Sequence, residues 1–347
     1  MSESFGVNLR KRVSSRGFKI FGFLWVLLAG ISLLLVRFFP IEVSELQHRW
    51  ELRRAGVKSV GVPLASKFSS GASRLQGYEQ NFCQADESLA RRECTCVLLL
   101  HGTGDQALTW RKILVEPRES WVKSVRLFAL DLPGTGDSWT PARTADYTAR
   151  TLADITFQSV LEFVPRSECR AWMVVGNSHG GWVAAWMAVD HADRVNKLML
   201  VDSAGLESQK AGTQDVSKWF DGSVAGLKEF QKRAYFRPRE LPESVWSKAA
   251  ARLKTLREKM KAAHPEFEQV LLEQERLDAH LGTIRANTLV FWGKEDRITF
   301  PEAGREFTQR IHGARLREAP ECGHLPQKEC PAALMKALNE WVQYGGM

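Results

Sequence analysis

The fold is decided by residues 172–189, which read WMVVGNSHGGWVAAWMAV. Residues 172–175 predict a buried strand, residues 182–189 predict a helix, and the turn between them has the pattern Gly-x-Ser-x-Gly. Small residues two positions before and after the serine let a strand and a helix approach around a turn that is too tight for side chains. The turn therefore predicts a nucleophile, Ser178, close to a helix N-terminus, where developing negative charge is stabilised.

Strands and helices alternate on both sides of this turn. Short apolar runs predict further strands at 97–100, 125–130, 198–201, 288–292 and 314–318, and apolar positions at steps of three and four predict helices at 149–164, 302–311 and 331–344. Alternation of this kind is typical of a mostly parallel sheet with helices on both faces. The predicted fold class is therefore α/β.

A helical insertion interrupts the predicted sheet. Residues 216–281 contain no convincing strand, whereas residues 243–261 and 266–281 have helical spacing. The strand pattern resumes only after this segment. We therefore expect a helical cap between two parts of one sheet domain.

A serine hydroxyl is a weak nucleophile at neutral pH, so Ser178 needs a general base that is oriented by a carboxylate. His324 lies in the loop ECGHLP (321–326) after the last predicted strand, and Asp296 follows the strand before it. The order Ser178, Asp296, His324 along the chain is the order used by hydrolases whose serine lies on a strand–turn–helix motif. These three residues are the predicted catalytic triad.

The charge of the chain does not indicate nucleic-acid binding. The formal net charge is +8, but the first 19 residues hold +4 of it, from Arg10, Lys11, Arg12, Arg16 and Lys19 against Glu3. The other 328 residues carry only +4. A nucleic-acid-binding protein would concentrate its basic excess on a folded domain. A hydrophobic content of 44% also excludes a disordered chain.

The basic tail leads into an apolar run. Residues 20–39 contain one charged side chain, Arg37, and as a helix they would span about 30 Å, the thickness of a bilayer core. The run predicts an uncleaved membrane anchor; a cleaved signal peptide and a buried helix are the alternatives. Because the basic cluster before the run is denser than the mixed flank after it, the N-terminus is expected in the cytoplasm and the catalytic domain on the other side, which is the periplasm in a bacterium.

The predicted organisation along the chain has six parts. A basic cytoplasmic tail (1–19) precedes the transmembrane anchor (20–39) and a membrane-proximal linker with the first strand region (40–74). The sheet domain occupies 75–205 and 284–347, on either side of the helical cap at 206–283. The oligomeric state is not indicated by the sequence.

Five motifs follow one another along the chain: HGTG (101–104), DLPGTGDS (131–138), GNSHGG (176–181), Asp296 and Gly323-His324. In this order they resemble the successive signatures of the alpha/beta-hydrolase superfamily, over residues 75–345. The GNSHGG turn and the cap are similar to those of the meta-cleavage-product hydrolases, which cleave carbon–carbon bonds. The anchor, cap and serine are similar to those of membrane-bound monoacylglycerol lipases. Serine as nucleophile argues against the epoxide hydrolases and haloalkane dehalogenases, whose nucleophile is an aspartate.

The resemblance implies further site residues. The oxyanion hole would be formed by the backbone N–H groups of His179 and Thr103. Gly102 and Gly104 would let the backbone come close to the substrate. Asp202 is a second candidate for the acid, because some members of the superfamily carry the carboxylate at the end of that strand.

The resemblance also implies a function. A membrane-anchored serine hydrolase would cleave a carboxylic ester of a small lipid-like or amphiphilic molecule, with no metal or organic cofactor. A carbon–carbon hydrolase would use the same triad and is the first alternative. A non-catalytic binding protein with the hydrolase fold is the second.

Six cysteines are an even number, which suits disulfide pairing in an exported domain. Cys322 and Cys330 flank His324, and we expect them to form a bridge. In the alpha/beta-hydrolase sheet the third and fifth strands are neighbours, so Cys94 or Cys96 is expected to pair with Cys169. Cys83 would then pair with the remaining cysteine. Buried, reduced thiols are the alternative.

Overall fold

The computed structural model describes residues 40–68, 72–83, 94–121, 124–209, 218–266, 269–270 and 273–343. The predicted basic tail and membrane anchor, residues 1–39, lie outside the described residues. No helix within the described ranges is long and apolar enough to cross a bilayer. The chain divides into two units, Met1–Gln47 and His48–Met347, and the fold below is that of the second.

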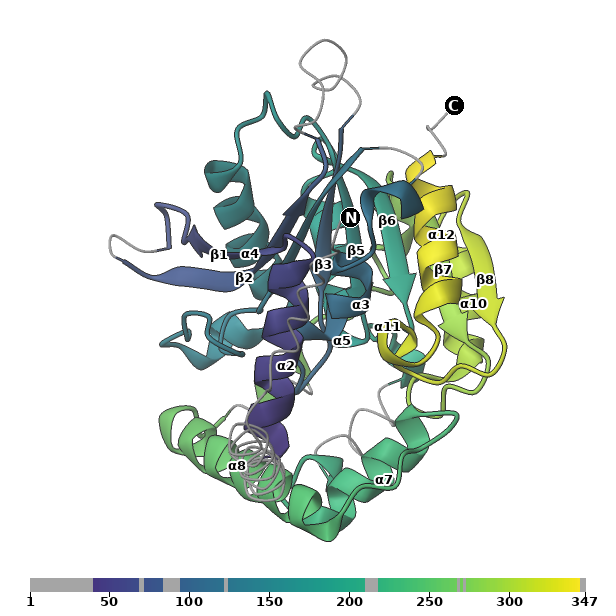
Figure 1. Cartoon of the computed structure of the whole chain (residues 1–347). Coiled ribbons are helices and arrows are strands. Elements are labelled where there is room, and N and C mark those ends of the chain that lie inside the picture. The colour runs from purple at the N-terminus through teal and green to yellow at the C-terminus, as the bar shows by residue number, and fades with distance from the viewer. Residues whose placement is uncertain are drawn as a thin grey trace, which may run out of the picture. The chain divides into compact units, whose positions relative to one another are not determined.

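Eight strands form one sheet in the order β1-β2-β4-β3-β5-β6-β7-β8 (Figure 1). Their bounds are Lys58–Pro63, Arg74–Asn81, Thr95–Leu100, Val125–Leu130, Trp172–Asn177, Val195–Val201, Asn287–Gly293 and Arg315–Ala319 for β1 to β8. β2 is antiparallel to both β1 and β4, and all other neighbouring strands are parallel. The predicted strands correspond to β3 through β8, so the predicted α/β fold with a mostly parallel sheet is confirmed.

The central strands are buried on both faces, which explains why they read as continuous apolar runs. All six residues of β5 are buried, and so are the last five residues of β3. In a parallel sheet that is covered on both sides, both sets of alternating side chains enter a core. Strand β2, between the edge strand β1 and β4, instead mixes exposed, half-buried and buried residues and carries little apolar signal.

Helices cover both faces of this sheet. The α-helices of the described residues, including the two cap helices α7 and α8, have the following bounds: α2 Pro40–Arg54, α3 Arg111–Leu114, α4 Ala149–Phe163, α5 His179–Asp190, α7 Val224–Ala234, α8 Glu243–Ala263, α10 Phe300–Arg310, α11 Pro326–Glu329 and α12 Pro331–Gln343. One core cluster joins the sheet to α4, α5 and α10 through Phe157, Trp186 and Phe307. The other joins it to α3 and α12, with Ile113 and Leu338 among its members.

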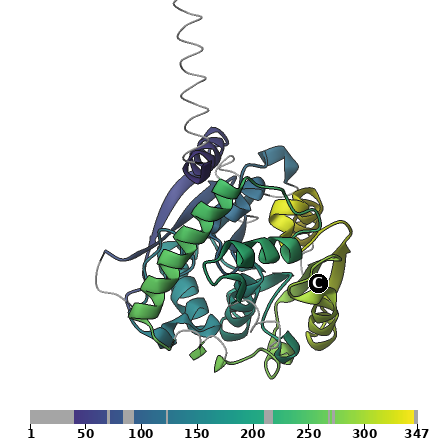
Figure 2. The same ribbon diagram turned by 90° about the horizontal axis from the view of Figure 1, so that it is seen from below.

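The insertion forms a helical cap. Its helices α7 and α8 lie together beyond one end of the sheet, and Figure 2 shows both of them from below. The predicted helix at 266–281 is wrong at its C-terminal end, because residues 277–283 form turns and a short 3-10 helix. The Leu277 N–H donates to Gly205 O (3.0 Å), outside any helix, and this contact turns the chain back towards the sheet.

Residues 40–74, predicted as a linker with the first strand region, contain α2, β1 and the first residue of β2. The three disulfides join Cys83 to Cys94, Cys96 to Cys169, and Cys322 to Cys330. The predicted pairing is confirmed, and the structure selects Cys96 as the partner of Cys169. Cys96 of β3 lies opposite Trp172 of the neighbouring β5, which brings it close to the cysteine just before that strand.

Candidate active site

Ser178 occupies the sharp turn between β5 and α5. Its backbone has φ 56° and ψ −122°, a conformation that costs a non-glycine residue about 1–3 kcal/mol. The turn is held because Ser178 N–H donates to Val201 O (3.0 Å) and Ser178 O accepts from Ala204 N–H (3.0 Å). A Cβ atom on Gly176 would lie 2.0 Å from Gly180 O, so no larger residue fits there. The predicted strand–turn–helix around the serine is confirmed.

His324 and Asp296 are joined by a buried hydrogen bond. His324 Nδ1 lies 2.9 Å from Asp296 Oδ2, and each residue is only 2% exposed. With Nδ1 donating to a carboxylate, Nε2 of the neutral imidazole holds the lone pair that a general base needs. The structure therefore brings together the predicted base and the predicted acid.

Asp296 is held as an anion by its surroundings. Its Oδ1 accepts from the N–H groups of Ile298 (2.7 Å) and Thr299 (3.2 Å), and its Oδ2 accepts from Thr299 Oγ1 (2.5 Å). Burial by itself would raise the pKa of this carboxyl, but His324, Thr299 and the Ile298 N–H outweigh it and hold the pKa below its ordinary value. Thr299, which was not predicted as a site residue, thus helps to keep Asp296 ionised.

Asp202, the second candidate acid, lies close by but is differently placed. Its Oδ1 accepts from Gly293 N–H (2.9 Å), and its buried Oδ2 has no hydrogen-bond partner. Burial first, and then the charge of Asp296, raise the pKa of Asp202 well above its ordinary value. The hydrogen bond to the imidazole comes from Asp296, and this geometry favours Asp296 as the triad acid.

Asp202, Asp296 and His324 are the residues of the described chain that could hold a metal ion, since one ligand atom from each lies within 4.8 Å of the others. However, His324 Nδ1 and both oxygens of Asp296 are already engaged in hydrogen bonds. Asp202 Oδ2 makes no hydrogen bond. A histidine whose Nδ1 is held by a carboxylate, with Nε2 left free, suits a general base better than a metal centre.

The loop that carries His324 is tied to the nucleophile's neighbour. Asn177, the residue before Ser178, donates from Nδ2 to His324 O (3.0 Å) and to Val201 O (3.1 Å). Gln327 donates to Asn177 Oδ1 (3.0 Å) and is itself fully buried. This network fixes the backbone at His324 relative to the turn. Neither amide was predicted as a site residue, although Asn177 belongs to the GNSHGG motif.

The predicted oxyanion residues belong to two segments beside Ser178. Thr103 follows Gly102, where a Cβ atom would lie 3.0 Å from Ser178 Cβ, so this loop runs directly beside the nucleophile. His179 is the first residue of α5, and the first N–H groups of a helix have no intrahelical partner. Gly104 has a φ of 73°, which favours glycine at that position.

Ser178 and His324 are not hydrogen-bonded to each other in this structure. Contacts of this kind are often long without substrate and shorten only when the reacting complex forms. Backbone ties bring the two residues to one end of the sheet, because Ser178 follows the end of β5 and His324 O is bound to Asn177. The side-chain contact itself remains a prediction.

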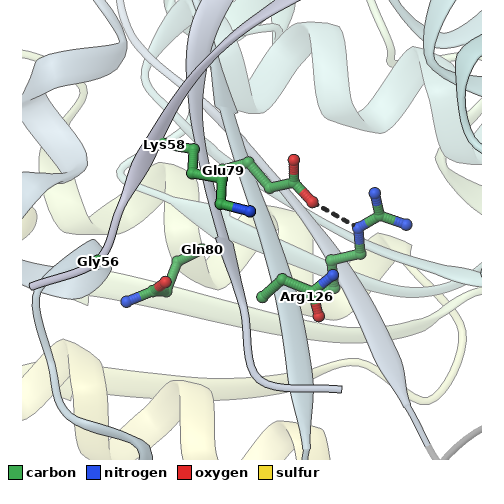
Figure 3. A pocket seen from close by; sticks show the side chains of 6 residues that line it. Gly56, Lys58, Glu79, Gln80 and Arg126 are labelled. Atoms are coloured by element: carbon green, nitrogen blue, oxygen red, sulfur yellow. Dashed lines mark hydrogen bonds and ion pairs between the residues drawn. The ribbon is translucent and has the colours of Figure 1, made fainter. Parts of the chain in front are cut away.

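A separate cavity of about 200 Å³, seen from close by in Figure 3, is lined by residues at the start of β1, the end of β2 and the start of β4. Its lining includes Lys58 at the start of β1 and Arg126 near the start of β4, whereas Ser178 follows the end of β5. Arg126 Nε is paired with Glu79 Oε1 at 2.8 Å, which neutralises part of the lining. This cavity therefore does not belong to the candidate active site.

The comparisons with known proteins agree with this geometry. The Alpha/beta hydrolase family matches residues 97–337, more than half of the chain. The chain belongs to the alpha/beta hydrolase family. It is a hydrolase with the fold of that family, and the resemblance inferred from the motifs is confirmed.

Relatives within the family are distant. The chain is 25% identical over 243 residues to the 2-hydroxy-6-oxononadienedioate/2-hydroxy-6-oxononatrienedioate hydrolase of Klebsiella pneumoniae, covering 67% of this chain and 82% of that protein. It is 26% identical over 250 residues to the 2-hydroxymuconate semialdehyde hydrolase of a Pseudomonas species, covering 71% and 86%. A bacterial membrane phospholipase A, described as a virulence factor, has a similar structure with a TM-score of 0.68 and 22% identity; the match covers 94% of this chain and all of that one.

Proposed function

We propose that this hydrolase cleaves the carboxylic ester of a lipid-like or amphiphilic substrate by way of an acyl-enzyme. The observation that carries the proposal is the buried 2.9 Å hydrogen bond between His324 and Asp296, at the same end of the sheet as the strained turn that presents Ser178. A nucleophile, a base and an orienting anion are the three parts that acyl transfer to a hydroxyl requires.

The reaction would proceed in two halves. Ser178 Oγ attacks the ester carbonyl while His324 Nε2 takes its proton, and Asp296 stabilises the resulting imidazolium. The carbonyl oxygen, now negative, is held by the N–H groups of His179 and Thr103. His324 then protonates the leaving alcohol, and the same imidazole later activates a water molecule that releases the acid.

Two features support a lipid-like substrate. The predicted anchor at 20–39 would keep the enzyme at a membrane, where the local concentration of amphiphilic esters is high. On the cap, α8 exposes Lys254 and Lys259 together with Leu256, which is 53% exposed. Exposed cationic and apolar groups on one helix suit the surface of an anionic membrane.

The same proposal includes a location. We place the N-terminus in the cytoplasm and the hydrolase domain on the non-cytoplasmic side, and the three disulfides support an oxidising compartment. The full chain should stay with membranes after a carbonate wash, while a chain that begins at Pro40 should be released. Protease added from the non-cytoplasmic side should digest the hydrolase domain, and protection from that side would overturn the topology.

Carbon–carbon bond hydrolysis is the second candidate. It is favoured by the similarity to two hydrolases of semialdehyde or dienedioate compounds, at 26% and 25% identity. The triad would serve that reaction as well, so the distinction has to come from substrates. A panel of nitrophenyl esters, monoacylglycerols and a vinylogous 1,5-diketone from ring cleavage separates the two activities.

Replacement of the nucleophile tests both candidates at once. Ser178→Ala should lower ester hydrolysis by about four to six orders of magnitude and abolish labelling by a fluorophosphonate. Ser244→Ala, on the exposed surface of α8, is the matched control and should keep both properties. Labelling retained by Ser178→Ala would refute the assignment of the nucleophile, and a wild-type chain that neither labels nor turns over any substrate would favour a binding protein.

A further inference from the structure

At the start of α5, directly after Ser178, a group of buried side-chain nitrogen atoms has no hydrogen-bond partner. Within the described part of the chain, Arg276 Nε, Nη1 and Nη2, Trp182 Nε1 and His179 Nε2 are all buried and make no hydrogen bond. Arg276 belongs to the segment between α8 and β7, and the two rings belong to the first four residues of α5. Buried nitrogen donors are paired in the large majority of cases, so this group requires an explanation.

The three side chains form one cluster close to the nucleophile. The Arg276 guanidinium lies over the indole of Trp182, with Cζ 4.6 Å from the ring centroid. The His179 imidazole meets the same indole edge-on, with ring centroids 6.0 Å apart. Leu277, next to Arg276, donates to Gly205 O (3.0 Å), and Ala204, next to Gly205, donates to Ser178 O (3.0 Å). Two backbone hydrogen bonds thus connect the segment that carries Arg276, through residues 204–205, to Ser178.

Arg276 is the positive charge of this cluster. Burial first, then His101 and Arg276, lower the pKa of His179 to about 4, so its imidazole is neutral at pH 7. Glu207 and Asp278 are the carboxylates whose charges act on Arg276, and Asp278 has other partners: its Oδ1 is paired with Arg310 (2.6 Å), and its Oδ2 accepts from the backbone N–H of Glu207 (2.8 Å). Neither carboxylate forms a hydrogen bond with Arg276.

A buried cation without an acceptor is costly, and stacking on an indole compensates only part of that cost. The planar fork of a guanidinium matches the two oxygens of a carboxylate or a phosphate. We propose that Arg276, stacked on Trp182 and flanked by His179, binds an anionic group of the substrate, a carboxylate or a phosphate, that is distinct from the scissile ester. The proposal rests on the ester hydrolysis proposed above and narrows its substrate class to anionic amphiphiles.

Matched substrates test this subsite. A 4-nitrophenyl monoester of glutaric acid carries a terminal carboxylate, a 4-nitrophenyl ester of 4-phosphonooxybutanoic acid carries a phosphate, and 4-nitrophenyl pentanoate is neutral. We expect the kcat/KM of wild type to be higher for one of the two anionic esters than for the neutral ester. Arg276→Gln should reduce that preference by at least about thirtyfold, the usual effect of truncating one partner of a buried charge pair.

A conservative variant and a control variant accompany Arg276→Gln. Arg276→Lys keeps the charge without the fork and should retain part of the preference. Arg285→Gln lies nine positions further along the same connecting segment, is exposed, and should leave the preference unchanged. The two anionic esters separate the carboxylate from the phosphate, because the correct group is the one whose preference Arg276→Gln removes.

The outcomes are distinguishable. Equal losses on the anionic and neutral esters, or a wild type without preference, would overturn the subsite while leaving ester hydrolysis standing. No turnover of any ester by wild type, together with no fluorophosphonate labelling, would instead refute the proposed function. If Arg276→Gln does not fold, thermal unfolding of wild type and Arg276→Lys is followed with dodecanoate, dodecyl phosphate and dodecanol. The proposal then requires that one anion, and not the alcohol, raises the Tm of wild type more than that of the lysine variant.

Discussion

Glu329 Oε2 accepts a 2.7 Å hydrogen bond from the backbone N–H of Gly323, the residue before His324. The same carboxylate accepts from the N–H groups of Phe236 (3.0 Å) and Arg237 (2.9 Å), which follow the cap helix α7. His324 N–H, in turn, donates to Ala234 O at the end of that helix (2.7 Å). One half-buried carboxylate thus joins the histidine loop to the cap, and the position of His324 depends on both.

Removing this anion should affect stability and catalysis together. Glu329→Ala leaves three backbone donors without an acceptor, and we expect a loss of at least about 2 kcal/mol in the free energy of unfolding. Because the loop is then free to move away from Ser178, kcat should fall at least about tenfold with little change in KM. Urea unfolding and ester kinetics measure both. Glu302→Ala, whose side chain is 75% exposed, is the control, and a stable Glu329→Ala enzyme with normal kcat would contradict the role in positioning.

The two buried aspartates should respond differently to amide substitution. Asp296→Asn removes the anion that accepts from His324 Nδ1 and can favour the wrong tautomer, so kcat should fall by about 10³ to 10⁴. Asp202 has a pKa well above the ordinary value, so an amide resembles its neutral carboxyl, and Asp202→Asn should cost less than about tenfold. Parallel kcat measurements decide the matter, and the reverse ranking would move the acid to Asp202.

Much of the fold could be predicted because burial on both faces makes a parallel strand a continuous apolar run. Strand β4 was predicted at its observed bounds, and β5 only two residues short. The antiparallel pair β1 and β2 was not resolved into two strands, since only one residue of β1 and three residues of β2 are buried, which leaves little apolar signal. The end of the helix predicted at 266–281 was misplaced because Leu277 bonds to Gly205, a contact between distant parts of the chain.

The triad residues could be found from motif order, whereas the groups that hold them could not. Thr299, Gln327 and Glu329 act through hydrogen bonds to Asp296, Asn177 and Gly323, and such pairings depend on the packed loops rather than on spacing. Arg276 belongs to no sequence motif, and only the structure reveals that its buried nitrogen atoms have no hydrogen-bond acceptor. Sequence patterns indicate periodic elements and local turns, whereas these contacts depend on neither.

His179 should make the protein less stable in acid. Its folded pKa of about 4 lies below the ordinary value of 6.5, so between these values the unfolded chain binds a proton that the folded chain does not. Stability therefore falls as pH drops through this window, by up to about 2 kcal/mol at pH 5. The urea midpoints of wild type and His179→Gln at pH 7.5 and pH 5 test this. The variant should lose less stability between the two values, and an equal loss would refute the neutral, buried imidazole.

Two disulfides of similar loop length should have equal effects on stability and unequal effects on activity. Cys322–Cys330 and Cys83–Cys94 close loops with sequence separations of 8 and 11, so each should contribute about 2.5 kcal/mol by the chain-entropy estimate. Only the first loop contains His324. The double variant Cys322→Ala/Cys330→Ala should therefore lose at least about tenfold in kcat, whereas Cys83→Ala/Cys94→Ala keeps most of it, with urea unfolding and ester kinetics as the measurements. Peptide mapping without reducing agent verifies that the other two bridges are intact in each variant, and equal kcat losses in the two variants would show that the first bridge stabilises the fold without positioning the histidine.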